Sequence, residues 1–152
     1  MEIRKAKISD IKIIHKLINE FARKGEMLPR SLNELYENIR DFFIAEDNNE
    51  IKGVCALHIL WEDLAEIRSL VVRKESQKKG LGSILVKNCL NEAKQFGIKK
   101  IFVLTYIPEF FKKTGFKEHD KSKLPQKIWS DCIKCPKFPE CEEVALIYEF
   151  KE

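Results

Sequence analysis

Residues 66–93 have the types and spacing of a strand, a glycine-containing loop and a helix. The β-branched, apolar run Ile67 to Val72 is typical of a buried strand, and apolar residues recur at helical spacing after the loop. Gln77, Gly80 and Gly82 lie between these segments, where the helix begins. Because glycine has no Cβ atom, a bulky anion can approach the backbone N–H groups there, and the dipole of the helix favours phosphate. The segment therefore predicts a phosphate-binding loop.

Two common nucleotide-binding loops do not fit this segment. A Walker loop ends in Gly-Lys-Ser/Thr, which is absent, and a Rossmann loop needs a third glycine where Leu85 stands. The pattern Gln/Arg-x-x-Gly-x-Gly/Ala is met by Gln77, Gly80 and Gly82, and in this form the segment resembles the acetyl-CoA-binding motif of the GNAT superfamily of N-acetyltransferases. The resemblance implies that acetyl-CoA is bound by Leu70, Val71, Val72, Gln77, Lys78, Lys79, Gly80, Leu81, Gly82, Ser83 and Phe111.

Four further segments narrow the resemblance. Met27–Ser31, Ala65–Val72, Leu104–Phe116 and Leu124–Trp129 look like the acetyltransferase domain of the N-acetylglutamate synthases, in a short form that lacks the kinase domain of longer relatives. This resemblance covers nearly the full chain. It implies acetyl transfer from acetyl-CoA to the α-amino group of an amino acid, with L-glutamate as acceptor in arginine biosynthesis. The alternatives are another small amine or a protein N-terminus as acceptor, or a non-catalytic module that senses coenzyme or metal.

Transfer to a protonated amine requires a base, since an α-amino group is largely protonated near pH 7. The candidate is Glu66, which begins the strand before the loop, where the resembling synthases carry their general base. The other interpretations of Glu66 are a solvent-facing carboxylate or a partner of Arg68. A backbone N–H near Leu70 or Val71, exposed where this strand diverges from its neighbour, is expected to stabilise the thioester oxygen.

The proton donor to the departing thiolate has three interpretations. Many members of the superfamily place a tyrosine four residues before a Gly-Phe pair, and Phe111, which has no hydroxyl group, occupies that position here. By resemblance to the synthases, Thr105 is the favoured donor, ahead of Tyr106. A third interpretation is that no acid is needed, because a thiol with a pKa near 8.5 is already a fair leaving group.

Binding of glutamate requires cations for two carboxylates, and a planar guanidinium suits each of them. Arg30 lies in the Leu-x-Arg-Ser segment, which resembles the carboxylate-binding segment of the synthases. Arg68 follows Glu66 by two residues in the predicted strand, so both side chains are expected on one face. Lys127, after the Leu-Pro pair, is the third candidate, and ordinary surface charge is the alternative interpretation of all three.

A cysteine-containing loop at about residues 119–142 is not required by such a fold. Cys132, Cys135 and Cys141 have a spacing that can chelate a structural zinc ion. A zinc signature usually has two separated cysteine pairs, so reduced, metal-free thiols are the favoured interpretation and no metal site is assigned. A disulfide between Cys132 and Cys135 is the remaining alternative.

Composition and length limit the class of protein. The 152 residues predict one domain, and 28 basic against 24 acidic residues leave a net charge of only +4, with the basic residues scattered along the chain. This argues against a nucleic-acid partner. We find no signal peptide or long apolar span, so we expect a cytoplasmic location, no membrane partner, small-molecule ligands, and a monomer or homodimer.

The elements that must position these residues alternate along the chain. Apolar periodicity and turn residues predict an α/β fold with a mixed, largely antiparallel central sheet flanked by helices. Ser9 is expected to cap the first helix, and Ser31 with Glu34 forms a capping-box pattern that opens the second. Strands are predicted at Glu2–Lys7, Phe42–Glu46, Ile51–Trp61, Glu66–Arg73, Lys100–Thr105 and Glu143–Phe150; helices at about 10–24, 32–39, Leu81–Phe96 and after Pro108.

Overall fold

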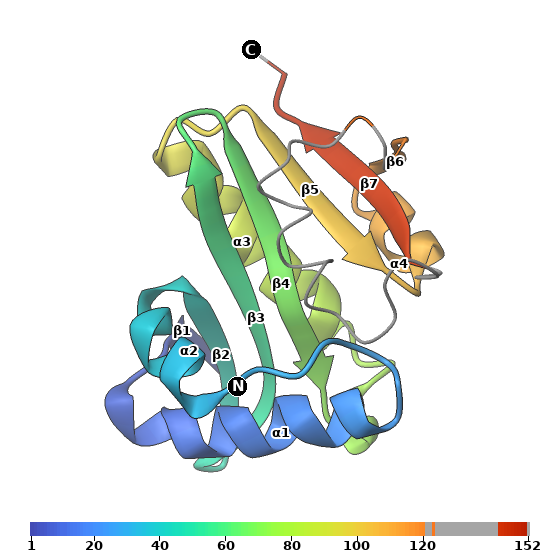
Figure 1. Cartoon of the computed structure of the whole chain (residues 1–152). Coiled ribbons are helices and arrows are strands. Elements are labelled where there is room, and N and C mark those ends of the chain that lie inside the picture. Colours follow the sequence, from blue (N-terminus) through green and yellow to red (C-terminus); the bar gives the residue numbers. More distant parts are fainter. Residues whose placement is uncertain (121–122, 124–142, 152) are drawn as a thin grey trace.

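The computed structural model describes residues 1–120, 123 and 143–151. Within this part of the chain, seven strands form one sheet in the order β1-β2-β3-β4-β5-β7-β6 (Figure 1). Every neighbouring pair is antiparallel except β4 and β5, which are parallel. The predicted mixed, largely antiparallel sheet is therefore confirmed. The strands are β1 (Glu2–Lys5), β2 (Phe42–Asp47), β3 (Glu50–Trp61), β4 (Leu64–Val72), β5 (Lys100–Thr105), β6 (Lys117–Glu118) and β7 (Val144–Glu149).

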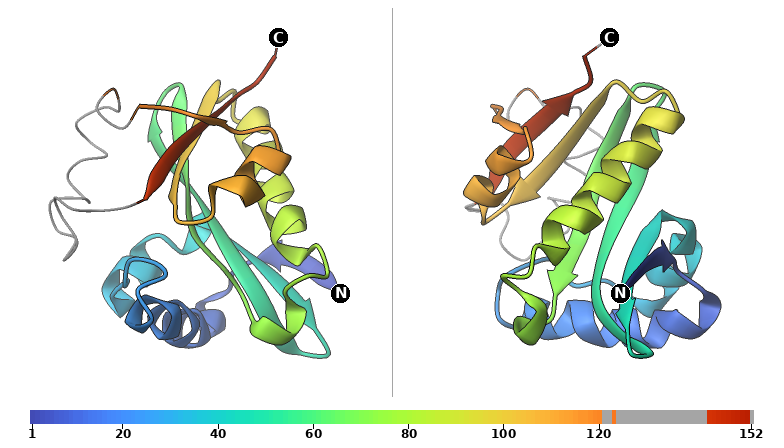
Figure 2. Two further views of the ribbon diagram at one scale, coloured as in Figure 1. Left: turned by 90° about the vertical axis from the view of Figure 1, so that its right-hand side faces the viewer. Right: turned by 180° about the vertical axis from the view of Figure 1, so that it is seen from behind.

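Helices cover both faces of the sheet. Helices α1 (Ile11–Arg23) and α2 (Leu32–Glu37) lie on one face, and α3 (Leu81–Gln95) and α4 (Pro108–Lys113) lie on the other (Figure 2). Each face has its own apolar core. The core under α1 contains residues such as Ile14, Ile44 and Val54, and the core under α3 contains residues such as Leu57, Ile67 and Leu85. No helix in the described ranges is long and apolar enough to span a membrane.

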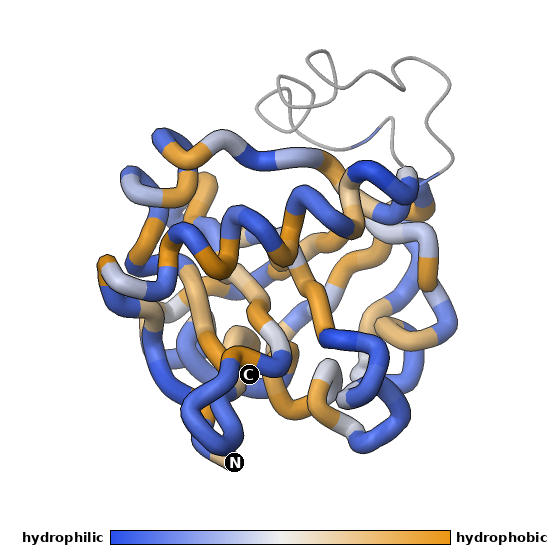
Figure 3. The backbone as a smooth tube through the Cα atoms, turned by 90° about the horizontal axis from the view of Figure 1, so that it is seen from below, coloured by the Kyte–Doolittle hydropathy of each residue, from blue (hydrophilic) through white to orange (hydrophobic). Residues whose placement is uncertain are grey.

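Helix α1 is strongly amphipathic. Apolar and polar residues alternate along it (Figure 3), and Ile11, Ile14, Leu17 and Ile18 are buried against the sheet. The prediction that Ser9 caps this helix is wrong. Ser9 lies inside a short 3-10 turn, Ile8–Asp10, and it is the Asp10 carboxylate that accepts the Lys7 amide at 2.7 Å. This turn also ends β1 at Lys5, two residues before its predicted end.

The β2–β3 hairpin has a two-residue turn. Asn48 and Asn49 both have positive φ, at 51° and 63°, which is the geometry of a type I′ turn. Asparagine tolerates this left-handed region better than most residues, so Asn48 and Asn49 suit the tight turn between the predicted strands Phe42–Glu46 and Ile51–Trp61. Helix α3 ends as predicted, with Gly97 at φ +82° just after its C-cap, Phe96.

Three apolar residues of α2 and α3 are solvent-exposed, and one short strand was not predicted. Helix α2 has only six residues and buries Leu35, whereas Leu32 and Tyr36 remain 37% and 38% exposed. Ile84 is exposed because it lies at the edge of the apolar stripe of α3, which is formed by Leu81, Leu85, Val86, Cys89, Leu90 and Ala93. Strand β6 has two residues, too few to produce an alternating pattern.

Strands β4 and β5 separate partway along their length. Their register runs from Leu64 opposite Lys100 to Glu66 opposite Phe102, and beyond this point the strands diverge (Figure 1). The first three residues of β4 therefore have a neighbouring strand on each side, while the rest of the strand leaves the edge toward β5 open. Strand β5 continues beside β7 up to Thr105, which pairs with Val144. The predicted divergence of this strand from its neighbour is confirmed.

Candidate active site

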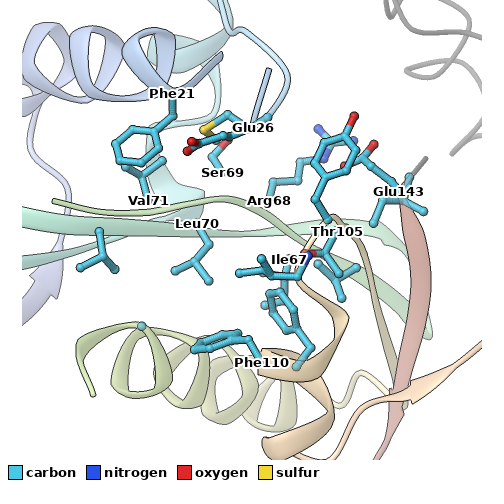
Figure 4. A pocket seen from close by; sticks show the side chains of 18 of the residues that line it. Phe21, Glu26, Ile67, Arg68, Ser69, Leu70, Val71, Thr105, Phe110 and Glu143 are labelled. Carbon is cyan, nitrogen blue, oxygen red and sulfur yellow. The ribbon is translucent and has the colours of Figure 1, made fainter. Parts of the chain in front are cut away.

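A cavity of about 830 Å³ occupies the opening between β4 and β5 and reaches both faces of the sheet (Figure 4). Phe21 and Glu26 approach it from the α1 side, and Phe110 approaches from the side of α3 and α4. The lining residues are Phe21, Gly25, Glu26, Met27, Leu28, Arg30, Glu66, Ile67, Arg68, Ser69, Leu70, Val71, Val72, Gln77, Lys78, Gly80, Leu81, Gly82, Ser83, Val103, Leu104, Thr105, Tyr106, Ile107, Phe110, Phe111, Lys113 and Glu143.

A β-bulge in β4 reverses which residues face each side of the sheet. Between Ala56, which pairs with Arg68, and Val54, which pairs with Val71, strand β4 has one extra residue, and Ser69 has a φ of +54°. Before the bulge, Ala65 and Ile67 pack in the core under α3; after it, Leu70 and Val72 do so. The bulge thus turns the backbone around Ser69 and Leu70 at the open edge of β4. Sequence periodicity did not reveal it.

The loop between β4 and α3 has the geometry of an anion site. The N-cap of α3 is Gly80 at φ +77°, and the first intrahelical hydrogen bond runs from the Ile84 amide to the Gly80 carbonyl. The amides of Leu81, Gly82 and Ser83 precede that bond, so they lack an acceptor within the helix and are available for a phosphate. All three residues line the cavity.

Two contacts explain why Gln77 and Gly82 suit their positions in this loop. Gln77 Nε2 donates to the Val72 carbonyl at 2.9 Å and so ties the loop to the end of β4. A Cβ atom added at Gly82 would lie 3.1 Å from the Phe110 ring, closer than an ordinary contact, so a side chain there would push against this ring. Of the predicted coenzyme residues, Lys79 is absent from the cavity lining, and the other ten line the cavity.

Glu66 and Arg68 lie on the same face of β4, as predicted, and are joined by an ion pair. Arg68 Nε donates to Glu66 Oε1 at 2.5 Å, and both side chains are largely buried. Glu66 also lies opposite His58 on β3, whose Nδ1 is 2.6 Å from Asp41 Oδ2. The interpretation of Glu66 as a partner of Arg68 is confirmed. The carboxylate nevertheless lines the cavity, where it can also meet a substrate.

Thr105, Tyr106 and Phe111, at or near the position expected for a proton donor to the thiolate, all line the cavity. Thr105 is 7% exposed, and its Oγ1 accepts the Ile107 amide at 2.9 Å, which leaves its hydroxyl proton available for donation. Tyr106 follows it in the cavity wall. Phe111 is buried edge-on between Phe110 and Phe116, at centroid distances of 5.0 and 5.4 Å, so its part is packing.

Arg30 reaches the cavity from the loop that joins α1 to α2. Ser31 Oγ accepts the Glu34 amide at 3.1 Å, which confirms Ser31 as the N-cap of α2. The Arg30 guanidinium is 3.3 Å from the Glu34 carboxylate, one helical turn away. A smaller recess adjoins the main cavity, and Arg30, Arg68 and Ser69 line both. The structure therefore brings the two predicted arginines to one side of the same site.

Some predicted residues lie outside the described ranges. These are Lys127 and the cysteines at 132, 135 and 141, so the third substrate cation and the cysteine loop stay predictions. Within the described ranges, no group of three or more His, Cys, Asp and Glu side chains is arranged to hold a metal ion. Lining residues that sequence reasoning missed include Phe21, Glu26, Phe110 and Glu143. These residues belong to segments that are far apart in the sequence, and no local sequence motif marks them as part of a site.

Comparison with known proteins agrees with this geometry. The sequence profile of the acetyltransferase (GNAT) family matches residues 11–116. An uncharacterized N-acetyltransferase from Chlorobaculum tepidum is 41% identical over 145 residues, which are 95% of this chain and 94% of that protein. An amino-acid acetyltransferase from Mycobacterium tuberculosis is 33% identical over 132 residues, or 85% of this chain and 75% of that protein.

A solved structure shares the whole described fold. The N-acetylglutamate synthase of Neisseria gonorrhoeae, determined in complex with coenzyme A and N-acetyl-glutamate, matches with a TM-score of 0.90 at 27% identity. The match covers 99% of this chain but 35% of the synthase chain, so this chain is similar to one part of a larger protein. The family profile, the full-length relative and the open β4–β5 edge beside an amide-lined helix terminus lead to one conclusion: the chain is an acetyltransferase of the GNAT family.

Proposed function

We propose that this acetyltransferase transfers the acetyl group of acetyl-CoA to the α-amino group of an amino acid, with L-glutamate as the acceptor, and so serves arginine biosynthesis. One observation carries the proposal: a single cavity contains the amide-rich start of α3, the Glu66 carboxylate and the two arginines Arg30 and Arg68. The first feature suits a pyrophosphate, the second a proton acceptor and the third two carboxylates. The similarity to an amino-acid acetyltransferase supports the same choice.

The donor is proposed to lie along the open edge of β4. Its pyrophosphate accepts hydrogen bonds from the first amides of α3, beginning at Leu81, and its thioester enters the opening beyond the Glu66–Phe102 pair. A main-chain N–H at Leu70 or Val71 donates to the thioester oxygen as negative charge develops there. Because β5 has already diverged at this point, it does not compete for that edge of β4.

The acceptor amine loses a proton to Glu66, directly or through one water molecule, and its lone pair then attacks the thioester carbon. A carbon–nitrogen bond forms, the carbon–sulfur bond breaks, and the products are the N-acetylated amino acid and free coenzyme A. Thr105, in preference to Tyr106, donates a proton to the departing sulfur; otherwise the thiolate leaves unaided. The Arg68 guanidinium holds Glu66 on this path and, as part of the cavity wall, attracts a substrate carboxylate by its positive charge.

A second candidate is acetylation of an amine that carries no carboxylate. Glu26 and Glu143 line the cavity together with Glu66, and carboxylates would favour a cationic acceptor. The two candidates differ in the sign of charge that the acceptor brings into the cavity.

A screen for release of free thiol decides between them. The purified chain is incubated with acetyl-CoA and each of the twenty amino acids, spermidine, or a short peptide with a free N-terminus. We expect the highest kcat/KM with L-glutamate. A preference for spermidine or the peptide would replace glutamate as the acceptor. Tight coenzyme binding with no turnover of any acceptor would indicate a non-catalytic coenzyme-binding module.

A further inference from the structure

Asn19, in the C-terminal half of α1, makes two hydrogen bonds with the main chain of Arg30. Its Nδ2 donates to the Arg30 carbonyl at 3.0 Å, and its Oδ1 accepts the Arg30 amide at 3.3 Å. The side-chain amide thus satisfies both polar groups of one residue, as a neighbouring peptide would in an antiparallel pair. The same Nδ2 also donates to the His15 carbonyl at 2.8 Å, which anchors the side chain on its own helix.

This contact lies where the chain has no regular structure of its own. Residues 24–31, between α1 and α2, belong to neither a helix nor a strand. Arg30 follows Pro29, which has no N–H group to donate, and precedes Ser31, the N-cap of α2. Asn19 and the Ser31 cap therefore hold Arg30 from both sides. A residue in α1 therefore fixes the main-chain position from which the Arg30 side chain extends.

The position of the Arg30 main chain matters for the acceptor site. Arg30 lines the cavity, its side chain is only 14% exposed, and its guanidinium contacts Glu34 at 3.3 Å. A long side chain on an unrestrained loop must be ordered each time a ligand binds, which weakens affinity. Because the Arg30 backbone is already held, less conformational entropy is lost when the guanidinium binds a carboxylate. Asn19 itself is not among the residues that line the cavity.

We infer that Asn19 is a positioning residue that sets the affinity for the acceptor by holding Arg30, with no contact to either substrate. This inference rests on the proposed function, because it takes Arg30 as the group that binds an acceptor carboxylate. It predicts that the acceptor site and the coenzyme site respond differently to loss of the side-chain amide.

The test replaces Asn19 with leucine, which has nearly the same shape and no hydrogen-bonding group. We expect Asn19→Leu to raise the KM for L-glutamate about tenfold, the loss expected for one or two net hydrogen bonds. The kcat and the KM for acetyl-CoA should stay within about twofold. The matched control is Asn88→Leu: Asn88 makes the same bond to a carbonyl one turn back, Ile84 at 2.9 Å, on α3 and away from the Arg30 loop.

A double-mutant cycle separates positioning from general destabilisation. If Asn19 acts through Arg30, the Asn19→Leu change should have no further effect on the KM for glutamate in an Arg30→Ala background. Additive effects, or an equal rise of both KM values, would overturn the inference.

Hydrogen exchange provides a readout that does not depend on the identity of the substrate. In Asn19→Leu, the amides of residues 25–31 should exchange faster than in the parent chain, while those of β3 and α3 keep their rates. Unchanged exchange in this loop would overturn the inference even if glutamate is the acceptor. Faster exchange together with no acetylation of glutamate by the parent chain would instead contradict the proposed function and leave the Asn19–Arg30 contact as a positioning device.

Discussion

At the scale of single residues, the role proposed for Glu66 can be separated from its ion pair with Arg68. A base acts in the transition state, so Glu66→Gln should lower kcat by roughly 10²- to 10⁴-fold while the affinity for acetyl-CoA changes little. The measurement is steady-state kinetics from pH 6 to 9 alongside calorimetric titration with acetyl-CoA. A variant with the kcat and pH–rate profile of the parent chain would remove Glu66 from the mechanism.

The matched variant for Glu66 is Arg68→Gln, which breaks the ion pair but keeps the carboxylate. If Arg68 orients Glu66 and binds a substrate carboxylate, this variant should lose in both kcat and the KM for the acceptor. A loss of protein stability with unchanged kinetics would mean that the ion pair serves the fold alone.

Arg30 is expected to recognise charge in the acceptor. Arg30→Ala should raise the KM for L-glutamate by an amount equivalent to about 1.5 to 3 kcal/mol, the range for a hydrogen bond to a charged group. Arg40, an exposed arginine just after α2, gives the matched control Arg40→Ala. The KM for an uncharged amine should be the same in Arg30→Ala and the parent chain, and an equal loss for both acceptors would indicate a structural role for Arg30.

At the scale of elements, the two loop glycines are expected to act differently. A methyl group at Gly82 would lie against the Phe110 ring at the mouth of the cavity, whereas at Gly80 it would meet nothing within 4 Å but would be strained by the φ of +77°. Gly82→Ala should therefore raise the KM for acetyl-CoA, and the bulkier Gly82→Val should raise it further. Gly80→Ala should chiefly lower stability, by roughly 1 to 2 kcal/mol.

Calorimetric titration with coenzyme A and thermal unfolding of these glycine variants give the two readouts. Parent-like coenzyme affinity in Gly82→Val would contradict the assignment of this loop to the coenzyme.

The junction of β1 and α1 depends on a buried carboxylate. Arg4 donates to Asp10 through two bonds, at 2.8 and 3.1 Å, and to Glu46 at 3.0 Å. The hydrogen bonds from Arg4 lower the pKa of the Asp10 carboxyl, with a smaller contribution from the Lys7 amide and despite its burial. A carboxyl whose pKa is lowered by folding stabilises the folded state above its unfolded pKa, and this contribution is lost as the pH falls through the folded pKa.

Asp10→Asn should therefore cost roughly 2 to 3 kcal/mol of unfolding free energy near pH 7, as expected for loss of a hydrogen-bonded charge. The difference from the parent chain should shrink as the pH falls below about 4, where the unfolded carboxyl takes up its proton. Urea unfolding at pH 7, 5 and 3 measures it. A difference that does not depend on pH would show that the ion pair is not its source.

At the scale of the whole molecule, the layer between the sheet and α3 encloses two thiols. Cys89 on α3 and Cys55 on β3 are fully buried, with their sulfur atoms 3.7 Å apart. The hydrogen bond to Cys55, together with burial, raises the pKa of the Cys89 thiol well above its ordinary value. Since the thiolate is the reactive form, iodoacetamide at pH 8 should modify neither residue in the native protein.

Peptide mass spectrometry after brief labelling resolves each cysteine separately, and labelling in urea provides the positive control. Modification of Cys55 or Cys89 in the native protein at the rate of a free thiol would mean that α3 separates readily from the sheet. The start of α3 carries the proposed coenzyme loop, so the measurement also tests how rigidly that loop is held.

Much of the fold was predictable because its signals are local. The periodicity of α1 and α3, the Asn-Asn turn, the Ser31 cap and Gly97 each depend on residues within one or two turns of one another. The loop from Gln77 to Gly82 was predictable for the same reason. The failure at Ser9 has a matching explanation, because the turn there is closed by Asp10, whose carboxylate is held by Arg4 on a different element.

The sequence by itself determined most of the helices and strands, the face shared by Glu66 and Arg68, and the glycine-containing loop before α3, since strand alternation and glycine geometry act over short distances. Only the tertiary structure decided where β4 leaves β5, that Ser69 begins a bulge, and that Asn19 holds Arg30. Those features depend on contacts between segments that are far apart in the chain. No local sequence pattern specifies such contacts, because they form only when the whole chain is packed. The cavity lies where the parallel pairing between β4 and β5 stops at Glu66, and this pairing joins two segments that are separated by the whole of α3.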